Sequence, residues 1–139
     1  MLKKINLQFL LSYLGLFPFL IILFDKFFFK SLDYNIVNDF SIFYSIIIFV
    51  FIGAINWNLK KNISILTIFI GFMPSLASVL IIIMFLYSYE VIYYLVILFI
   101  IQLILDYFIY NEKNSKVVFY QVRIPLTIVV ILCLIFIQF

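Results

Sequence analysis

Gln102, Asp106 and Arg123 are polar side chains that could do chemistry inside apolar stretches of this sequence. Gln102 and Asp106 are four residues apart, so a helix would place them on one face. Asp106 lies near the end of one apolar stretch and Arg123 near the start of the next, which puts them at similar depth in an antiparallel hairpin. An ion pair between them would fix the register of two helices. With Gln102 they would alternatively form a proton or anion site, or each would reach water unpaired.

Asn56 and Trp57 extend this candidate polar cluster, because they end an earlier apolar stretch on the same expected side of the membrane. Gly53 and Asn56 share a helix face at a spacing of three, where the glycine permits close helix contact and the amide bonds across it. A ligand contact by Asn56 is the alternative.

Other classes of chemistry lack their usual residues. The chain has no histidine, which removes the commonest general base and metal ligand near neutral pH. Cys133 is the single cysteine, so an internal disulfide cannot form. No phosphate-binding loop, catalytic triad or basic nucleic-acid surface is present. We therefore expect no catalytic residue, no cofactor, no metal and no nucleic-acid partner.

The elements that position these residues are predicted to be membrane helices. Apolar residues make up 68% of the 139 residues and charged residues only 11%. Five apolar stretches, at about 7–24, 40–57, 63–86, 91–110 and 119–139, are each long enough to cross a hydrocarbon core of about 30 Å. The first exceeds a signal-peptide core and is expected to be retained. The sequence thus predicts an all-α integral membrane bundle of about five transmembrane helices in a single domain, 1–139.

The positive charges predict the orientation of this bundle. With five spans, seven of the nine fall on one side: Lys3, Lys4, Lys60, Lys61, Lys113, Lys116 and Arg123. Lys26 and Lys30 fall on the other, in a connection expected over 25–39 that also carries Phe27–Phe29 and lies in the outer interface. The positive-inside rule then predicts a cytoplasmic N-terminus and an outside C-terminus, in a bacterial inner membrane.

Glycine, proline and serine residues within the spans predict kinks and close-packed faces: Gly15, Pro18, Gly53, Gly71, Pro74, Ser75 and Pro125. A proline inside a helix frees the carbonyl four residues earlier, which for Pro18 and Pro74 are those of Leu14 and Ile70. Pro125 falls in the first turns of the last span and marks where that helix begins. A broken helix whose free backbone binds an ion is the alternative for Pro18 and Pro74.

Several of these segments occur in an order that resembles a known family. They are 15–19 (GLFPF), 51–57 (FIGAINW), 74–76 (PSL), 102–106 (QLILD) and 120–127 (YQVRIPLT). Together, over roughly residues 13–137, the chain is similar to the transmembrane protein 69-like family, a domain of unknown function in bacterial inner membranes and mitochondria. Family members usually carry His-Trp-Gly where this chain has Asn56-Trp57-Asn58. The resemblance implies five membrane helices and no known activity.

Two functions are compatible with this pattern. The leading hypothesis is a non-enzymatic accessory, assembly or structural component of a membrane complex, acting by helix–helix contact with other membrane proteins or with itself. The alternative is a small transporter or proton- or ion-conducting protein that uses the polar cluster. A membrane enzyme acting on lipid is third, and the lack of histidine counts against it. The bilayer is the partner common to all three.

Overall fold

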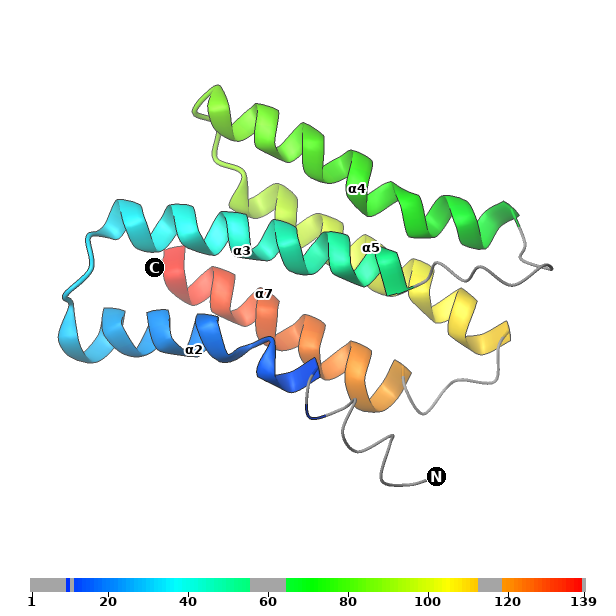
Figure 1. Ribbon diagram of the computed structural model, residues 1–139, viewed down its shortest axis with the longest axis horizontal. Helices are drawn as coiled ribbons and strands as arrows, with labels where there is room; N and C mark the ends of the chain where they lie inside the picture. The colour runs from blue at the N-terminus through cyan, green and yellow to red at the C-terminus, as the bar shows by residue number, and fades with distance from the viewer. Residues whose placement is uncertain (1–9, 11, 56–64, 113–118, 139) are drawn as a thin grey trace. The chain divides into compact units, whose positions relative to one another are not determined.

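The computed structural model describes residues 10, 12–55, 65–112 and 119–138, and over these residues all of its regular structure is helical. The elements are α2 (Phe17–Phe24), η1 (Asp25–Phe29), α3 (Tyr34–Ile55), α4 (Ile65–Leu86), α5 (Ile92–Glu112), η2 (Phe119–Arg123) and α7 (Ile124–Gln138) (Figure 1). The two η elements are single π-helical segments. Five stretches are long and apolar enough to cross a membrane: Ser12–Phe29, Tyr34–Ala54, Ile65–Leu86, Ile92–Ile109 and Phe119–Gln138. The prediction of five apolar helices is confirmed.

The chain divides into two compact units. Unit 1 contains Met1–Ser41 and Tyr110–Phe139, and unit 2 contains Ile42–Ile109. Helix α3 gives its first turns to unit 1 and the rest to unit 2. That the whole chain forms one transmembrane domain stays a prediction.

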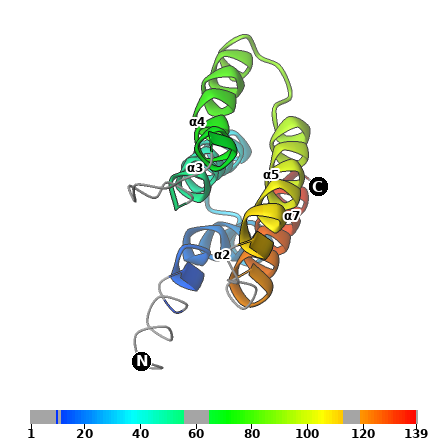
Figure 2. The ribbon, with the colours of Figure 1, turned by 90° about the vertical axis from the view of Figure 1, so that its right-hand side faces the viewer.

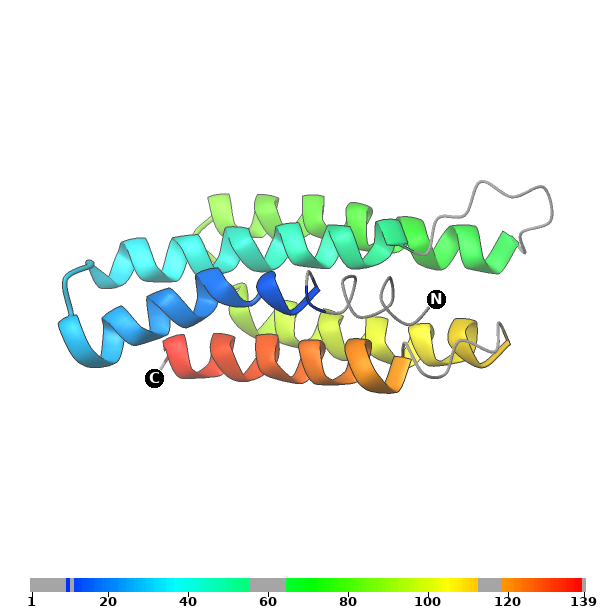
Figure 3. The same cartoon turned by 60° about the horizontal axis from the view of Figure 1, so that its bottom comes forward.

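In unit 1, α2 contacts α7 and the two helices run in the same direction (Figures 1 and 3). Hydrogen bonds join the two segments at both ends. The Tyr13 hydroxyl donates to the carbonyl oxygen of Gln121 at 2.6 Å, and Lys26 Nζ donates to that of Ile137 at 2.6 Å. The apolar side chains of this unit that are less than a tenth exposed are Leu16, Phe19, Ile22, Val37, Phe119, Val122, Val130, Cys133, Leu134 and Ile137.

The break near the start of the chain lies before Pro18. Gly15 and Leu16 form a turn, closed by N–H groups donating to the carbonyls of Ser12 and Tyr13. Helix α2 then begins at Phe17, so that Pro18 stands in its first turn and not within a continuous helix. Proline suits this position because its fixed φ is helical and the first N–H groups of a helix have no partner in any case.

The connection expected over 25–39 is much shorter in the structure, because both flanking helices extend into it. The helix continues as η1 to Phe29 and ends at Lys30, whose φ of 49° lies in the left-handed region and whose N–H donates to the carbonyl of Asp25 at 2.6 Å. The Asp25 carboxylate accepts hydrogen bonds from the Ser31 hydroxyl and, at 3.0 Å, from the Leu32 N–H. These bonds turn the chain within a few residues, so α3 starts at Tyr34.

In unit 2, α3 packs closely on α4 (Figure 2). A Cβ atom built on Gly53 would lie 2.7 Å from the carbonyl oxygen of Gly71 and 2.7 Å from Pro74 Cγ, closer than real Cβ atoms approach other heavy atoms. The rings of Phe43 and Phe85 meet edge to face, with centroids 5.2 Å apart. Gly53 and Gly71 thus bring two helix backbones close together, as small residues do between membrane helices.

Helix α5 also packs on α3 within unit 2. The Phe49 and Phe99 rings, each at most 2% exposed, meet edge to face with centroids 5.2 Å apart. Edge-to-face contact places the positive edge of one ring against the negative face of the other.

Pro74 lies inside α4 without ending it, and Ser75 beside it is half-buried.

Candidate functional site

Helix α5 positions Gln102 and Asp106 as a hydrogen-bonded pair inside the protein. Gln102 Nε2 donates to Asp106 Oδ1 at 3.0 Å, and the two residues are only 3% and 1% exposed. The four-residue spacing places both on one helix face, and the long apolar helix carries them into a region with little access to water. A carboxylate held by an amide donor at such a place can stabilise a fold, or bind and release a proton.

Arg123 is the last residue of η2 and is 5% exposed. It has an interaction partner within the chain, and so does Asp106 beyond its bond with Gln102. Pro125 follows as the second residue of α7. The two charged residues belong to different units, and the ion pair between Asp106 and Arg123 stays a prediction.

Of the five residues in the predicted polar cluster, the structure brings together Gln102 and Asp106. Asn56 and Trp57 lie outside the described residues. Their approach to Gln102, Asp106 and Arg123 therefore stays a prediction, as does a ligand contact by Asn56.

A second polar arrangement, at the end of unit 1, was missed by sequence reasoning. Lys26 Nζ donates to the carbonyl oxygens of Phe136 at 3.0 Å and Ile137 at 2.6 Å, and lies 6.0 Å from the centre of the Tyr34 ring. The last carbonyls of a helix lack intrahelical partners and carry partial negative charge, so an ammonium group is a favourable partner for them. Lys26 thus ties the end of α2 and η1 to the end of α7. A lysine just past an apolar run is a weak signal for such a bond, because nothing in the local sequence identifies carbonyls more than a hundred residues away.

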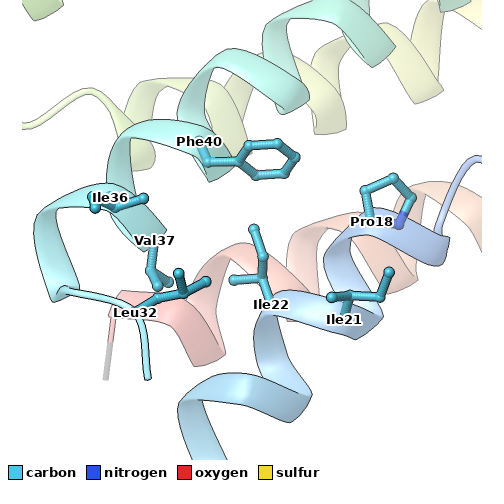
Figure 4. A pocket seen from close by; sticks show the side chains of 7 residues that line it. All are labelled: Pro18, Ile21, Ile22, Leu32, Ile36, Val37 and Phe40. Carbon is cyan, nitrogen blue, oxygen red and sulfur yellow. The ribbon is translucent and has the colours of Figure 1, made fainter. Parts of the chain in front are cut away.

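An apolar hollow lies beside this arrangement, also within unit 1. It has a volume of about 260 Å³, and Figure 4 shows the side chains that line it. Its lining comes from α2, from the connection after η1 and from the first turns of α3: Pro18, Ile21, Ile22, Leu32, Ile36, Val37 and Phe40. Sequence reasoning did not find it, because seven apolar residues among so many have no distinguishing pattern.

The part of the chain that the structure describes contains no set of side chains that could bind a metal ion. Within 10, 12–55, 65–112 and 119–138, no three His, Cys, Asp or Glu side chains are grouped so that they could hold a metal ion. Cys133 is buried as a free thiol among the apolar side chains of unit 1.

Residues 6–139 match the family model described as "Protein of unknown function (DUF3429)". No curated protein and no solved structure matches the chain.

Proposed function

We propose that this chain, which belongs to the DUF3429 family of proteins of unknown function, is an accessory or assembly component of a membrane complex. It would act without catalysis, by contact between its helices and those of other membrane proteins. Its five apolar helices are compatible with a multi-pass membrane protein.

The observation that supports this role is that the charged side chains of the candidate spans are engaged in contacts within the chain itself. The candidate spans contain five side chains of the Asp, Glu, Lys or Arg type, and each of them interacts within the chain: Asp25, Lys26, Asp39, Asp106 and Arg123. Every exposed residue of α4, in contrast, is apolar. In a bilayer such a surface offers van der Waals contact to lipid or to another helix, and no polar group to a dissolved substrate.

A tagged protein purified in mild detergent tests the proposal by the stoichiometry of what co-purifies. Wild type is compared with Asp106→Asn and Arg123→Gln, and with Glu90→Gln as a control, because Glu90 is an exposed carboxylate. We expect one membrane protein in fixed ratio with wild type and with the control. A homogeneous monomer or homo-oligomer, free of any stoichiometric partner at several detergent concentrations, would contradict the accessory role.

A second candidate function is proton or ion conduction, and the buried Gln102–Asp106 pair is the observation that favours it. A carboxylate at membrane depth is the usual proton carrier in such proteins. The test is proton flux into liposomes that contain the purified chain. Flux that Asp106→Asn abolishes and Glu90→Gln preserves would support conduction, and wild-type flux no greater than that of empty liposomes would contradict it.

Placement in the bacterial inner membrane, with a cytoplasmic N-terminus and an outside C-terminus, belongs to the same proposal. So does the finer likeness to transmembrane protein 69, which rests on the ordered segments of the sequence. Single cysteines test the orientation in a Cys133→Ser background. Lys30→Cys should react with an impermeant maleimide on intact spheroplasts, and Asn62→Cys only after lysis. The opposite labelling would reverse the orientation.

A further inference from the structure

The apolar hollow of unit 1 is suited to hydrocarbon and not to water. All seven lining side chains are apolar, and they surround a volume of about 260 Å³ (Figure 4). A buried water needs two to four polar partners, which these side chains do not offer. An unfilled hollow would lose the dispersion contacts that its lining atoms make with an occupant.

The position of the hollow along the helices indicates which hydrocarbon surrounds it and would fill it. One wall is α2, within the candidate span Ser12–Phe29, and the other is the start of α3, within the candidate span Tyr34–Ala54. The medium around both walls is therefore the bilayer, whose most abundant component at that depth is the lipid acyl chain.

Leu32 belongs both to the lining of the hollow and to the charged connection between η1 and α3. It lines the hollow, Lys30 lies two residues before it in the sequence and Asp33 directly after it, and both charged residues are exposed. Their neighbours Asp25 and Lys26 are already engaged, the first by Ser31 and Leu32 and the second by the last carbonyls of α7. The connection thus presents one cation and one anion where the hollow meets the end of the helices.

We propose that this hollow binds one acyl chain of a zwitterionic phospholipid, whose headgroup carries a phosphate and an amine. The lipid phosphate lies at the Lys30 ammonium group and the lipid amine at the Asp33 carboxylate, so the two headgroup charges meet charges of opposite sign. A lipid with a phosphate but no amine would satisfy Lys30 and leave Asp33 facing an anion. The site is independent of the accessory function, because it concerns the lipid and not a protein partner.

Native mass spectrometry of the detergent-purified chain, titrated with dioleoyl phosphatidylethanolamine, tests the chain-binding part. Ile21→Trp fills the hollow from a residue that is 51% exposed, so the fold should tolerate it. The matched control is Leu20→Trp, which is 52% exposed on the same helix and does not line the hollow. An acyl chain enters the hollow from detergent hydrocarbon and not from water, so what it gains there is dispersion contact with the lining side chains. Because the Ile21→Trp ring takes up that space, we expect this variant to weaken binding about tenfold. Equal affinity in Ile21→Trp and Leu20→Trp would overturn the site.

The headgroup part is tested with Lys30→Gln, Asp33→Asn and a parallel titration with dioleoyl phosphatidylglycerol. Wild type should bind the amine-bearing lipid more tightly than the glycerol lipid. Lys30→Gln should weaken binding of both lipids by about two- to five-fold, the range of exposed charge pairs. Asp33→Asn should remove the preference by strengthening the glycerol lipid relative to the amine lipid. A wild type without preference, or a preference that Asp33→Asn leaves unchanged, would overturn the headgroup assignment.

Discussion

Replacing Gly53 with alanine adds one methyl group at the closest contact between α3 and α4. The new Cβ would lie 2.7 Å from the carbonyl oxygen of Gly71 and 2.7 Å from Pro74 Cγ, against 3.4 Å for ordinary contact, so the helices must separate by about 0.7 Å. Both obstacles are rigid, one a backbone atom and the other a ring. Overpacking of this kind costs about 1–3 kcal/mol, and rigid neighbours favour the upper part of that range.

A second effect opposes this cost. Alanine is favoured over glycine within a helix by about 1 kcal/mol. Because the steric cost exceeds that gain, we expect Gly53→Ala to lower the free energy of unfolding by about 1–2 kcal/mol. The measurement is an SDS titration in mixed micelles, followed by far-ultraviolet circular dichroism. Combining Gly53→Ala with Pro74→Ala, which removes the ring carbon, should recover part of the loss.

Gly15→Ala is the matched control for the same added methyl group. Its Cβ would meet the Ser12 carbonyl oxygen at 3.2 Å, within the same turn, and no atom of another helix among the described residues. We expect a change below about 0.5 kcal/mol there. If Gly53→Ala is as stable as wild type, or if both variants lose equal stability, the close contact of α3 with α4 is refuted.

Three further substitutions test the polar contacts through the same titration. Lys26→Met should lower the free energy of unfolding by about 1.5–3 kcal/mol, because two helix-end carbonyls lose a charged donor. Lys30→Met, on an exposed side chain, should lower it little, and equal effects of the two variants would contradict the hydrogen bonds from Lys26 to α7. Gln102→Leu should cost about 1–3 kcal/mol, since it takes a donor from buried Asp106, and an unchanged stability would contradict the bond. Ser78→Ala should raise the free energy of unfolding by about 1 kcal/mol, because the buried Ser78 hydroxyl has no hydrogen-bond partner among the described residues. A clear loss of stability would show that this hydroxyl does make a hydrogen bond.

The sequence predicted the helices well where hydropathy alone decides them. The stretches 63–86 and 91–110 correspond closely to α4 (Ile65–Leu86) and α5 (Ile92–Glu112), because charged or turn-forming residues border both. The prediction stopped the first stretch at residue 24 and began the second at 40, since charged residues follow and precede these points. In the structure the helices continue to Phe29 and start at Tyr34, because Asp25 and Lys26 find partners that hydropathy does not register.

The candidate site was predictable only where its residues are close in the sequence. The four-residue spacing of Gln102 and Asp106 indicated a shared helix face, and the structure has them hydrogen-bonded. Lys26 and the carbonyls of Phe136 and Ile137 are about 110 residues apart, so their contact depends on how α2 meets α7. The hollow depends in the same way on the shape between two helices, which no local pattern encodes.

The division of unit 1 between the two ends of the chain has a consequence for synthesis. Unit 2 is one continuous stretch, Ile42–Ile109, and all its residues leave the ribosome before α7 does. The Tyr13–Gln121 and Lys26–Ile137 bonds span 108 and 111 residues, so they form only after nearly the whole chain has been made. At about 5–20 residues per second, the first helix waits on the order of ten seconds for its neighbour. During that interval the apolar face of α2 that later contacts α7 must be shielded by lipid or by the insertion machinery, and a chain truncated before α7 leaves this face without its partner helix.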